Sequence, residues 1–319
     1  MSTAAGHPRA SAARQGWQLA ELRGGQLHFT AADGLQRALK DGFFYVQQPA
    51  GTDLSAGDRF ARSFYLPGDA DDSGDADACG DGTRDPYRGF RRWTAGQLGR
   101  HQGYFCRDAD QTEQFFLEKA WWDRVYPAAL ARQAERMRDF ALAVQRAVLT
   151  RLDLPRALWD EATGHSLTPH GTHTLTFNHF RPEVAARGLN IHKDSGWVTV
   201  LRSTERGLEV DRDGDWRPID PIPGTFIVNF GCAMEILTRH TATPVAAVAH
   251  RVVRQPPGGA ARPDRFSYAL FVDSTLDDSV CPGLFAYEPG SGLRLEAGFG
   301  TFLDDILDHT YREDTTGLY

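Results

Sequence analysis

The stretch that decides the fold is Asn190-Ile191-His192-Lys193-Asp194-Ser195-Gly196-Trp197-Val198-Thr199-Val200-Leu201, in which two potential metal ligands precede a strand-like run. His192 and Asp194 are two residues apart, and side chains at positions i and i+2 of an extended backbone point to the same face. The imidazole and the carboxylate therefore project together. His250, in a second strand-like segment further along the chain, provides the third ligand that a metal site needs.

Short strand-like segments surround these residues in the second half of the chain. They are apolar, alternating or β-branched, and Pro, Gly and Asp clusters separate them. They occupy residues 173–180, 198–201, 207–210, 216–219, 225–229, 245–253 and 266–272. Many short strands without intervening helices favour a sandwich or a jelly roll.

Helical periodicity marks the first half of the chain and its end. Apolar residues recur at helical spacing over residues 31–39, 58–66, 121–150 and 299–311, and a short helix begins at Pro155. Pro127 fits either an early helical turn or a break between two helices. Residues 68–85 are acidic and rich in glycine, and we expect a surface loop there because the pattern of a calcium-binding loop is absent.

Composition restricts the class of protein. The chain has 319 residues, 41% of them hydrophobic, which suffices for a sizeable core. A net charge of −7 without a basic stripe argues against nucleic acid as a partner, and no apolar run approaches the ~20 residues of a membrane span. Four scattered cysteines without a Cys-x-x-Cys pair indicate a reduced, cytoplasmic protein. Residues 1–15 lack the apolar region of a signal peptide, and we expect a disordered tail.

A second pattern follows His250 at Arg265-Phe266-Ser267. On a strand, Arg265 and Ser267 share one face while Phe266 turns to the other. A buried guanidinium and a hydroxyl on one face suit a carboxylate, because the guanidinium fork binds two oxygens and the hydroxyl adds a donor. The apolar flanks of Arg265 favour a buried strand over a surface arginine.

The identity of the metal follows from the ligand types. Two histidines and one carboxylate that leave open positions opposite them form the facial triad of non-haem Fe(II) oxygenases. Four other histidines compete as ligands: His170, His173, His179 and His240. His170 and His173 are an odd number apart, so a strand would turn them to opposite faces. Taken singly, His192 and His250 are more often structural, but the complete set with Asp194 favours a metal site.

These motifs together resemble the iron- and 2-oxoglutarate-dependent oxygenases of the isopenicillin N synthase-like family. His192-x-Asp194…His250 looks like the metal triad, and Arg265-x-Ser267 looks like the 2-oxoglutarate clamp. The resemblance covers roughly residues 17–311 and includes the segments 41–46, 64–67, 86–90, 207–210, 216–219 and 223–231. It implies an α+β fold with a double-stranded β-helix, or jelly roll, between N-terminal helices and a C-terminal helix.

The resemblance also implies a domain organisation and a function. A single oxygenase domain would span residues 16–319, helical to about residue 165, with the jelly roll at about 170–275 and a closing segment at 276–319. Fe(II), 2-oxoglutarate and O2 would support oxidation of an unactivated C–H bond of a small molecule by hydroxylation, desaturation or cyclisation. We expect such a substrate to belong to specialised metabolism, as in antibiotic biosynthesis, with neither nucleic acid nor membrane as a partner.

Several roles stay open at this stage. Asn178 falls where the family often contacts 2-oxoglutarate, but it equally suits an ordinary strand position. Phe180 stands where the family often has a tyrosine, and we expect Phe180 and Trp197 to contact the substrate, although Trp197 equally suits packing in the core. We expect the segment Phe299–Tyr319 to fold over the site as a lid. Two other functions compete: an iron oxidase of the same fold that does not use 2-oxoglutarate, and a non-catalytic jelly-roll binding protein.

Overall fold

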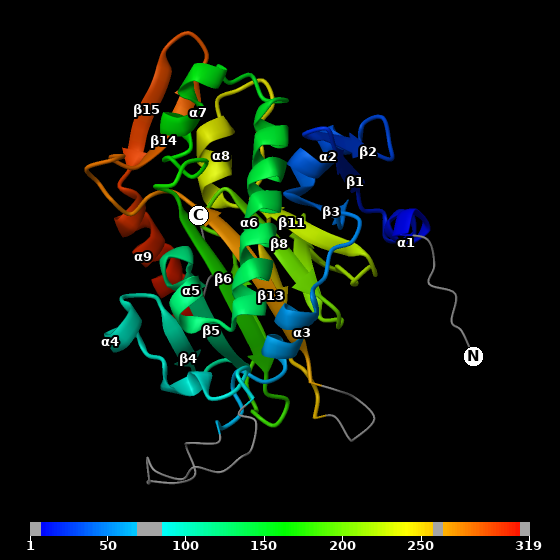
Figure 1. Cartoon of the computed structure of the whole chain (residues 1–319). Coiled ribbons are helices and arrows are strands. Elements are labelled where there is room, and N and C mark those ends of the chain that lie inside the picture. The colour runs from blue at the N-terminus through cyan, green and yellow to red at the C-terminus, as the bar shows by residue number, and fades with distance from the viewer. Residues whose placement is uncertain (1–7, 69–84, 258–263, 313–319) are drawn as a thin grey trace.

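The computed structural model describes residues 8–68, 85–257 and 264–312 of the chain (Figure 1). Within these residues a nine-stranded sheet and a four-stranded sheet form the body of the molecule, and a separate two-stranded sheet lies near the C-terminal end. A long helix crosses the larger sheet in Figure 1.

Eight strands from the second half of the chain form a jelly roll. Four are neighbours in the larger sheet, in the order β11 (Thr225–Phe230), β8 (Val198–Ser203), β13 (Phe266–Asp273) and β6 (Thr172–Phe180). The other four form the smaller sheet, in the order β10 (Asp215–Pro218), β9 (Leu208–Arg212), β12 (His250–Val252) and β7 (Leu189–His192). All neighbouring pairs within these two sets are antiparallel. The predicted α+β fold with a jelly-roll core is confirmed.

The interior of the jelly roll has an apolar end and a polar end. Apolar side chains of both sheets pack together at one end, among them Ile227 from the larger sheet and Val210 from the smaller. At the other end, buried polar side chains such as Asn178 line a cavity between the sheets. The apolar end fixes the separation of the sheets, and the polar end is available for ligands.

Further strands extend the larger sheet at both edges. On one side follow β3 (Phe43–Gln47), β1 (Leu19–Arg23) and β2 (Gln26–Phe29), and on the other β5 (Thr112–Glu118) and β4 (Gly103–Cys106). The prediction that the N-terminal part is helical is therefore wrong in part. The sequence of β5, Thr-Glu-Gln-Phe-Phe-Leu-Glu, does not indicate a strand, because its first three side chains are polar although they are buried.

Helices cover the outer face of the larger sheet and its ends. The longest, α6 (Ala128–Leu149), packs against β13 and β8 (Figure 1). Pro127 has a ψ of 142° and separates α6 from α5 (Trp122–Val125), so the predicted alternative of a break is confirmed. The remaining helices are α2 (Gly34–Asp41), α3 (Ser55–Ala61), α4 (Ala95–Leu98), α7 (Trp159–Ala162), α8 (Cys232–Thr238) and α9 (Phe299–Arg312). The strands β14 (Leu284–Glu288) and β15 (Gly292–Ala297) precede α9.

From the sequence, residues 1–15 are predicted to be a disordered tail and residues 68–85 a surface loop. Residues 8–15 form helix α1 (Pro8–Gln15), so the predicted disordered tail is wrong for these residues; residues 1–7 lie outside the described part. Gln15 ties the end of α1 to the sheet, because its Oε1 accepts hydrogen bonds from the Tyr45 hydroxyl and the Asp220 amide, both at 3.0 Å. The predicted loop at 68–85 lies almost wholly outside the described residues.

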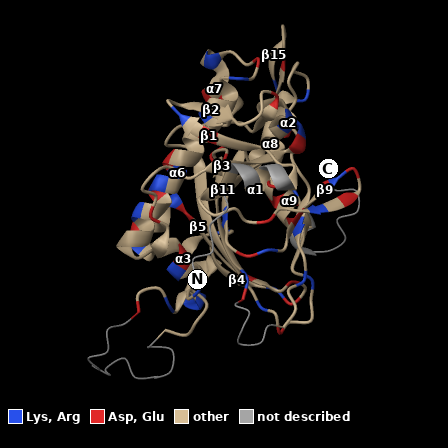
Figure 2. Cartoon of the chain, turned by 90° about the vertical axis from the view of Figure 1, so that its right-hand side faces the viewer, with Lys and Arg blue, Asp and Glu red and all other residues tan. Residues whose placement is uncertain are grey.

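Charged residues are interspersed along the chain. In the view of Figure 2, basic and acidic residues alternate along the helices and loops rather than gathering on separate faces. Among the described residues, no helix combines the length and the apolar character needed to cross a membrane.

Candidate metal centre

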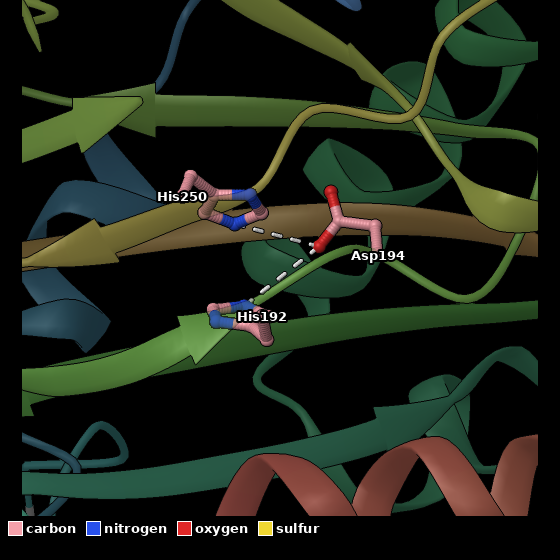
Figure 3. A group of neighbouring side chains, drawn as sticks. All are labelled: His192, Asp194 and His250. Carbon is pink, nitrogen blue, oxygen red and sulfur yellow. Dashed lines mark ion pairs between the residues drawn. The ribbon is translucent and has the colours of Figure 1, made fainter. Parts of the chain in front are cut away.

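The structure brings together the three side chains that the sequence predicts as metal ligands. His192 ends β7, Asp194 lies in the turn that follows, and His250 begins β12 directly opposite His192 in the strand register. Figure 3 shows the three side chains converging on one point. Asp194 Oδ1 lies 4.0 Å from His192 Nε2 and 3.7 Å from His250 Nε2. One atom from each residue lies within 4.8 Å of the others, a spacing that a single metal ion can bridge.

Backbone carbonyls orient both imidazoles. His192 Nδ1 lies 2.9 Å from the Asn190 carbonyl, and His250 Nδ1 lies 3.1 Å from the Val248 carbonyl. A carbonyl only accepts, so each Nδ1 carries the proton and each Nε2 lone pair faces the metal position. Burial, together with the nearby His250, lowers the pKa of His192 to about 4, which keeps this imidazole neutral and able to bind a metal at neutral pH.

The carboxylate of Asp194 is oriented by Asn229, a residue that the sequence analysis missed. Asn229 Nδ2 donates to Asp194 Oδ2 at 3.3 Å, which leaves Oδ1 directed at the histidines. The signal was present in the sequence, because Asn229 is the one amide in the otherwise apolar run Phe226–Phe230. Its own Oδ1 is buried and has no hydrogen-bond partner among the described residues, as expected beside a ligand.

Arg265 and Ser267 lie in the cavity that contains the metal ligands. Arg265 is only 3% exposed, its Nη1 donates to Ser267 Oγ at 3.3 Å, and its Nε donates to the Arg206 carbonyl at 3.2 Å. No ion pair joins it to a carboxylate of the described residues. Burial lowers the pKa of Arg265 to about 10, and the carboxylate of Glu205 opposes this shift only in part. A buried cation of this kind fits an anionic ligand.

Two further predicted contacts line this cavity. Phe180 lies under the guanidinium of Arg265, which is 4.5 Å from the ring centroid. Asn178 faces the same space and pairs with Ser267 across β6 and β13. The structure thus places Asn178 where a cofactor contact is possible.

Trp197 has a different place. Its side chain is fully buried in the main hydrophobic core, and its indole N–H donates to Ser274 Oγ at 3.1 Å. The prediction that Trp197 contacts the substrate is therefore corrected to a packing role. The indole is large enough to anchor the start of β8 behind the metal ligands.

A larger cavity of about 390 Å³ opens on the other side of the metal ligands. Its wall is largely apolar and aromatic, with contributions from β4, β5, β13 and α9: Phe105, Phe116, Phe271, Leu303, Ile306 and Leu307. Hydroxyl groups of Thr172, Thr174 and Thr176 on β6 form another side. The sequence did not reveal these residues because they come from separate elements that only the fold brings together.

The rival histidines lie elsewhere. His173 and His179 point to the outer face of β6, where His179 stacks between Tyr65 and Phe266 and contacts Glu113 at 2.7 Å. His170 and His240 are exposed. Among the described residues, His192, Asp194 and His250 form the one group with metal-binding spacing.

Comparison with known sequences finds a family model and relatives that parts of this chain resemble. Residues 171–274 match the sequence model of the 2OG-Fe(II) oxygenase superfamily. The chain is also 33% identical over 123 residues to Protein DMR6-LIKE OXYGENASE 2 of Arabidopsis thaliana, which covers 36% of this chain and 34% of the relative. The chain thus spans about a third of the length of this relative.

Solved structures show the same fold over most of the chain. The dioxygenase for auxin oxidation from rice superposes with a TM-score of 0.61 at 22% identity, covering 91% of this chain and 94% of that one. Neurospora crassa T7H in complex with alpha-KG and thymine gives a TM-score of 0.60 at 18% identity, with coverage of 88% and 92%. Residues 171–274, which match the 2OG-Fe(II) oxygenase superfamily model, contain all three candidate metal ligands.

Proposed function

We propose that this protein is an Fe(II)- and 2-oxoglutarate-dependent oxygenase that oxidises an unactivated C–H bond of a small molecule. One observation carries the proposal: the triad and the buried guanidinium of Arg265, which has no ion pair among the described residues, share one cavity within the part of the chain that matches the 2OG-Fe(II) oxygenase model. The larger cavity suits a small, largely apolar substrate, in keeping with hydroxylation, desaturation or cyclisation in specialised metabolism.

The residues present fit both absent groups. His192, Asp194 and His250 would hold Fe(II), because two neutral imidazole nitrogens and one carboxylate oxygen are its facial-triad ligands. Arg265 and Ser267 would hold the far carboxylate of 2-oxoglutarate through charge-assisted hydrogen bonds. When bound, these groups supply dioxygen activation coupled to the conversion of 2-oxoglutarate into succinate and carbon dioxide.

The chain itself contributes position and exclusion of water. His192 and Asp194 line both cavities, so a substrate in the larger cavity and a cosubstrate in the smaller one would meet at the metal. The apolar wall of Phe116, Phe271 and Leu303 would keep bulk water away from the reacting carbon. The oxidised bond is the one that this wall holds nearest to His192 and Asp194.

The test of this function is succinate formation. The purified protein, loaded with Fe(II), is incubated in air with 2-oxoglutarate and a panel of small apolar molecules, and succinate is quantified. We expect succinate from the parent protein and much less from Arg265→Met when 2-oxoglutarate is kept below saturation. Oxygen consumption without succinate would instead establish the 2-oxoglutarate-independent oxidase, and absence of both reactions despite bound iron would favour the non-catalytic binding protein.

A further inference from the structure

A chain of hydrogen bonds runs from the larger cavity to the smaller one through two side chains that neither the metal nor the clamp uses. Arg107 Nη1 donates to Gln114 Oε1 at 2.7 Å, and Gln114 Nε2 donates to Asn178 Oδ1 at 2.7 Å. Arg107 lines the larger cavity, whereas Gln114 and Asn178 line the smaller. Gln114 is 3% exposed and Asn178 9%, so water competes little for these bonds.

The chemistry of arginine fixes the donor-to-acceptor direction of these hydrogen bonds. A guanidinium has donors and no acceptor, so Gln114 must present its carbonyl oxygen to Arg107 and its NH2 group to Asn178. Asn178 must then present its own oxygen to Gln114. The amide donor of Asn178 is left for the cavity, where an anion would accept its hydrogen bond. Without Arg107, nothing in this chain would decide between the two orientations of either amide.

The strand register holds the three members of this arrangement in place. Gln114 on β5 pairs with Asn178 on β6, and Asn178 pairs with Ser267 on β13. Gln114, Asn178 and the clamp residue Ser267 therefore lie side by side across three strands. Arg107 follows β4 directly, and its guanidinium lies 5.5 Å from the Phe105 ring centroid, which restricts its position further.

We propose that Arg107 and Gln114 are positioning residues that hold Asn178 as a hydrogen-bond donor toward 2-oxoglutarate. The inference rests on the proposed function and deepens it. The reversed amide would turn a carbonyl oxygen toward a dianion, replacing attraction by repulsion. A hydrogen bond to a charged group is strong enough for its loss to weaken binding about ten- to a hundredfold.

The decisive variant is Gln114→Glu. A carboxylate at this position accepts from Arg107 but cannot donate, so it would draw the amide NH2 of Asn178 and rotate the Asn178 oxygen into the cavity. The glutamate side chain has nearly the same shape as the glutamine that it replaces. The affinity for 2-oxoglutarate is measured by calorimetry on the Fe(II)-loaded protein under argon, and we expect it to fall at least about tenfold.

Three controls separate positioning from other effects. Gln97→Glu adds the same charge at an exposed position whose side chain already accepts from the Thr94 amide, so 2-oxoglutarate affinity should not change. Arg107→Lys retains a donor to Gln114 and should bind nearly normally, whereas Arg107→Met should bind more weakly. Iron affinity and thermal unfolding of each variant verify that the metal site and the fold remain intact.

A double-mutant cycle with Asn178→Ala identifies the route of the effect. If Gln114 acts through Asn178, adding Gln114→Glu to Asn178→Ala changes the affinity little. An equal loss in both backgrounds would show direct repulsion by the new charge and overturn the inference, as would unchanged affinity in Gln114→Glu. A parent protein that binds iron but not 2-oxoglutarate would overturn the proposed function, and this inference with it.

Discussion

At the scale of single residues, one amide decides which oxygen of Asp194 faces the metal position. Asn229 Nδ2 engages Oδ2, and Oδ1 is thereby directed at the two histidines. Groups that orient a metal ligand in this way commonly contribute 10–100-fold to metal affinity. The same logic applies to the carbonyls of Asn190 and Val248, which set the tautomers of the histidines.

Removal of this amide should weaken metal binding. We expect Asn229→Ala to lower the affinity for Fe(II) about 10–100-fold while leaving the three ligands in place. Anaerobic titration with Fe(II) measures the effect, with His250→Ala as the variant that abolishes the site and His240→Ala, an exposed histidine, as the matched control. An affinity within twofold of the parent would show that Asp194 needs no such support.

Replacing Arg265 should preserve or raise the thermal stability of the protein but weaken its binding of 2-oxoglutarate. Arg265→Met removes a buried cation that has no ion pair among the described residues, so the ligand-free variant should melt at or above the temperature of the parent. The same change should weaken 2-oxoglutarate binding at least about thirtyfold, since the carboxylate loses its charged partner. Thermal melting with and without 2-oxoglutarate measures both effects. A variant that is stabilised by 2-oxoglutarate as much as the parent would exclude Arg265 as the clamp.

His173 should control stability in acid. Burial lowers its pKa to about 4, and its Nε2 donates to the Ser166 carbonyl at 2.9 Å. In the unfolded chain this histidine has a pKa near 6.5, so below that pH the unfolded state gains a proton that the folded state does not take up. The contribution of neutral His173 to the free energy of unfolding is therefore fully present above pH 6.5 and is lost as the pH falls toward 4. The shift amounts to about 3 kcal/mol.

A neutral substitute tests this assignment. His173→Gln keeps an N–H donor for Ser166 but does not ionise, so its free energy of unfolding should decline less than that of the parent between pH 7 and pH 4. Urea unfolding of the metal-free proteins at several pH values gives the two profiles. Parallel profiles would show that other groups cause the acid sensitivity.

At the scale of elements, helix α9 closes the larger cavity. Leu303, Ile306 and Leu307 line that cavity, and Asp304 on the same helix contacts Arg100 at 2.8 Å and His101 at 2.9 Å. The lid expected from the sequence spans residues 299–319, of which α9 forms the described part and residues 313–319 lie outside it; its closing motion remains a proposal. The contacts of Asp304 span the mouth of the cavity from α9 to the loop before β4.

Weakening this contact should loosen α9 alone. Asp304→Asn removes the charge that Arg100 and His101 share, and the ion pair is exposed enough to contribute at most about 1 kcal/mol. We expect faster amide hydrogen exchange in residues 299–312 and unchanged exchange in the jelly-roll strands. Asp33→Asn, which removes an exposed ion pair with Arg37 on α2, serves as a comparison. Equal acceleration in both variants, or in neither, would argue against a latch at Asp304.

The elements also show where sequence reasoning succeeds. Strands of the jelly roll follow from alternation and β-branching, and the triad and clamp follow from the i, i+2 rule, which places His192 beside Asp194 and Arg265 beside Ser267. Strand β5 was not predicted, because the side chains of Thr112–Gln114 are polar and yet are buried by partners on β4 and β6. Asn229, Gln114 and the cavity wall depend on contacts between distant segments, which no local pattern encodes.

At the scale of the whole molecule, two sheets act as a rigid frame around one polar end. Apolar packing at the opposite end and the α6 layer outside hold the sheets, and the sheets in turn position the ligands from β7 and β12. The two cavities meet at these ligands. This arrangement lets a cosubstrate and a substrate approach one ion from different sides.

The central claim is that the triad and Arg265 form one site for Fe(II) and 2-oxoglutarate. The most direct measurement is the visible absorption of the Fe(II)-loaded protein under argon as 2-oxoglutarate is added. We expect a weak charge-transfer band of the chelate in the parent and in His240→Ala, and no band in His250→Ala. An absent band in a parent protein that binds both iron and 2-oxoglutarate, or a band that survives in His250→Ala, would contradict this claim.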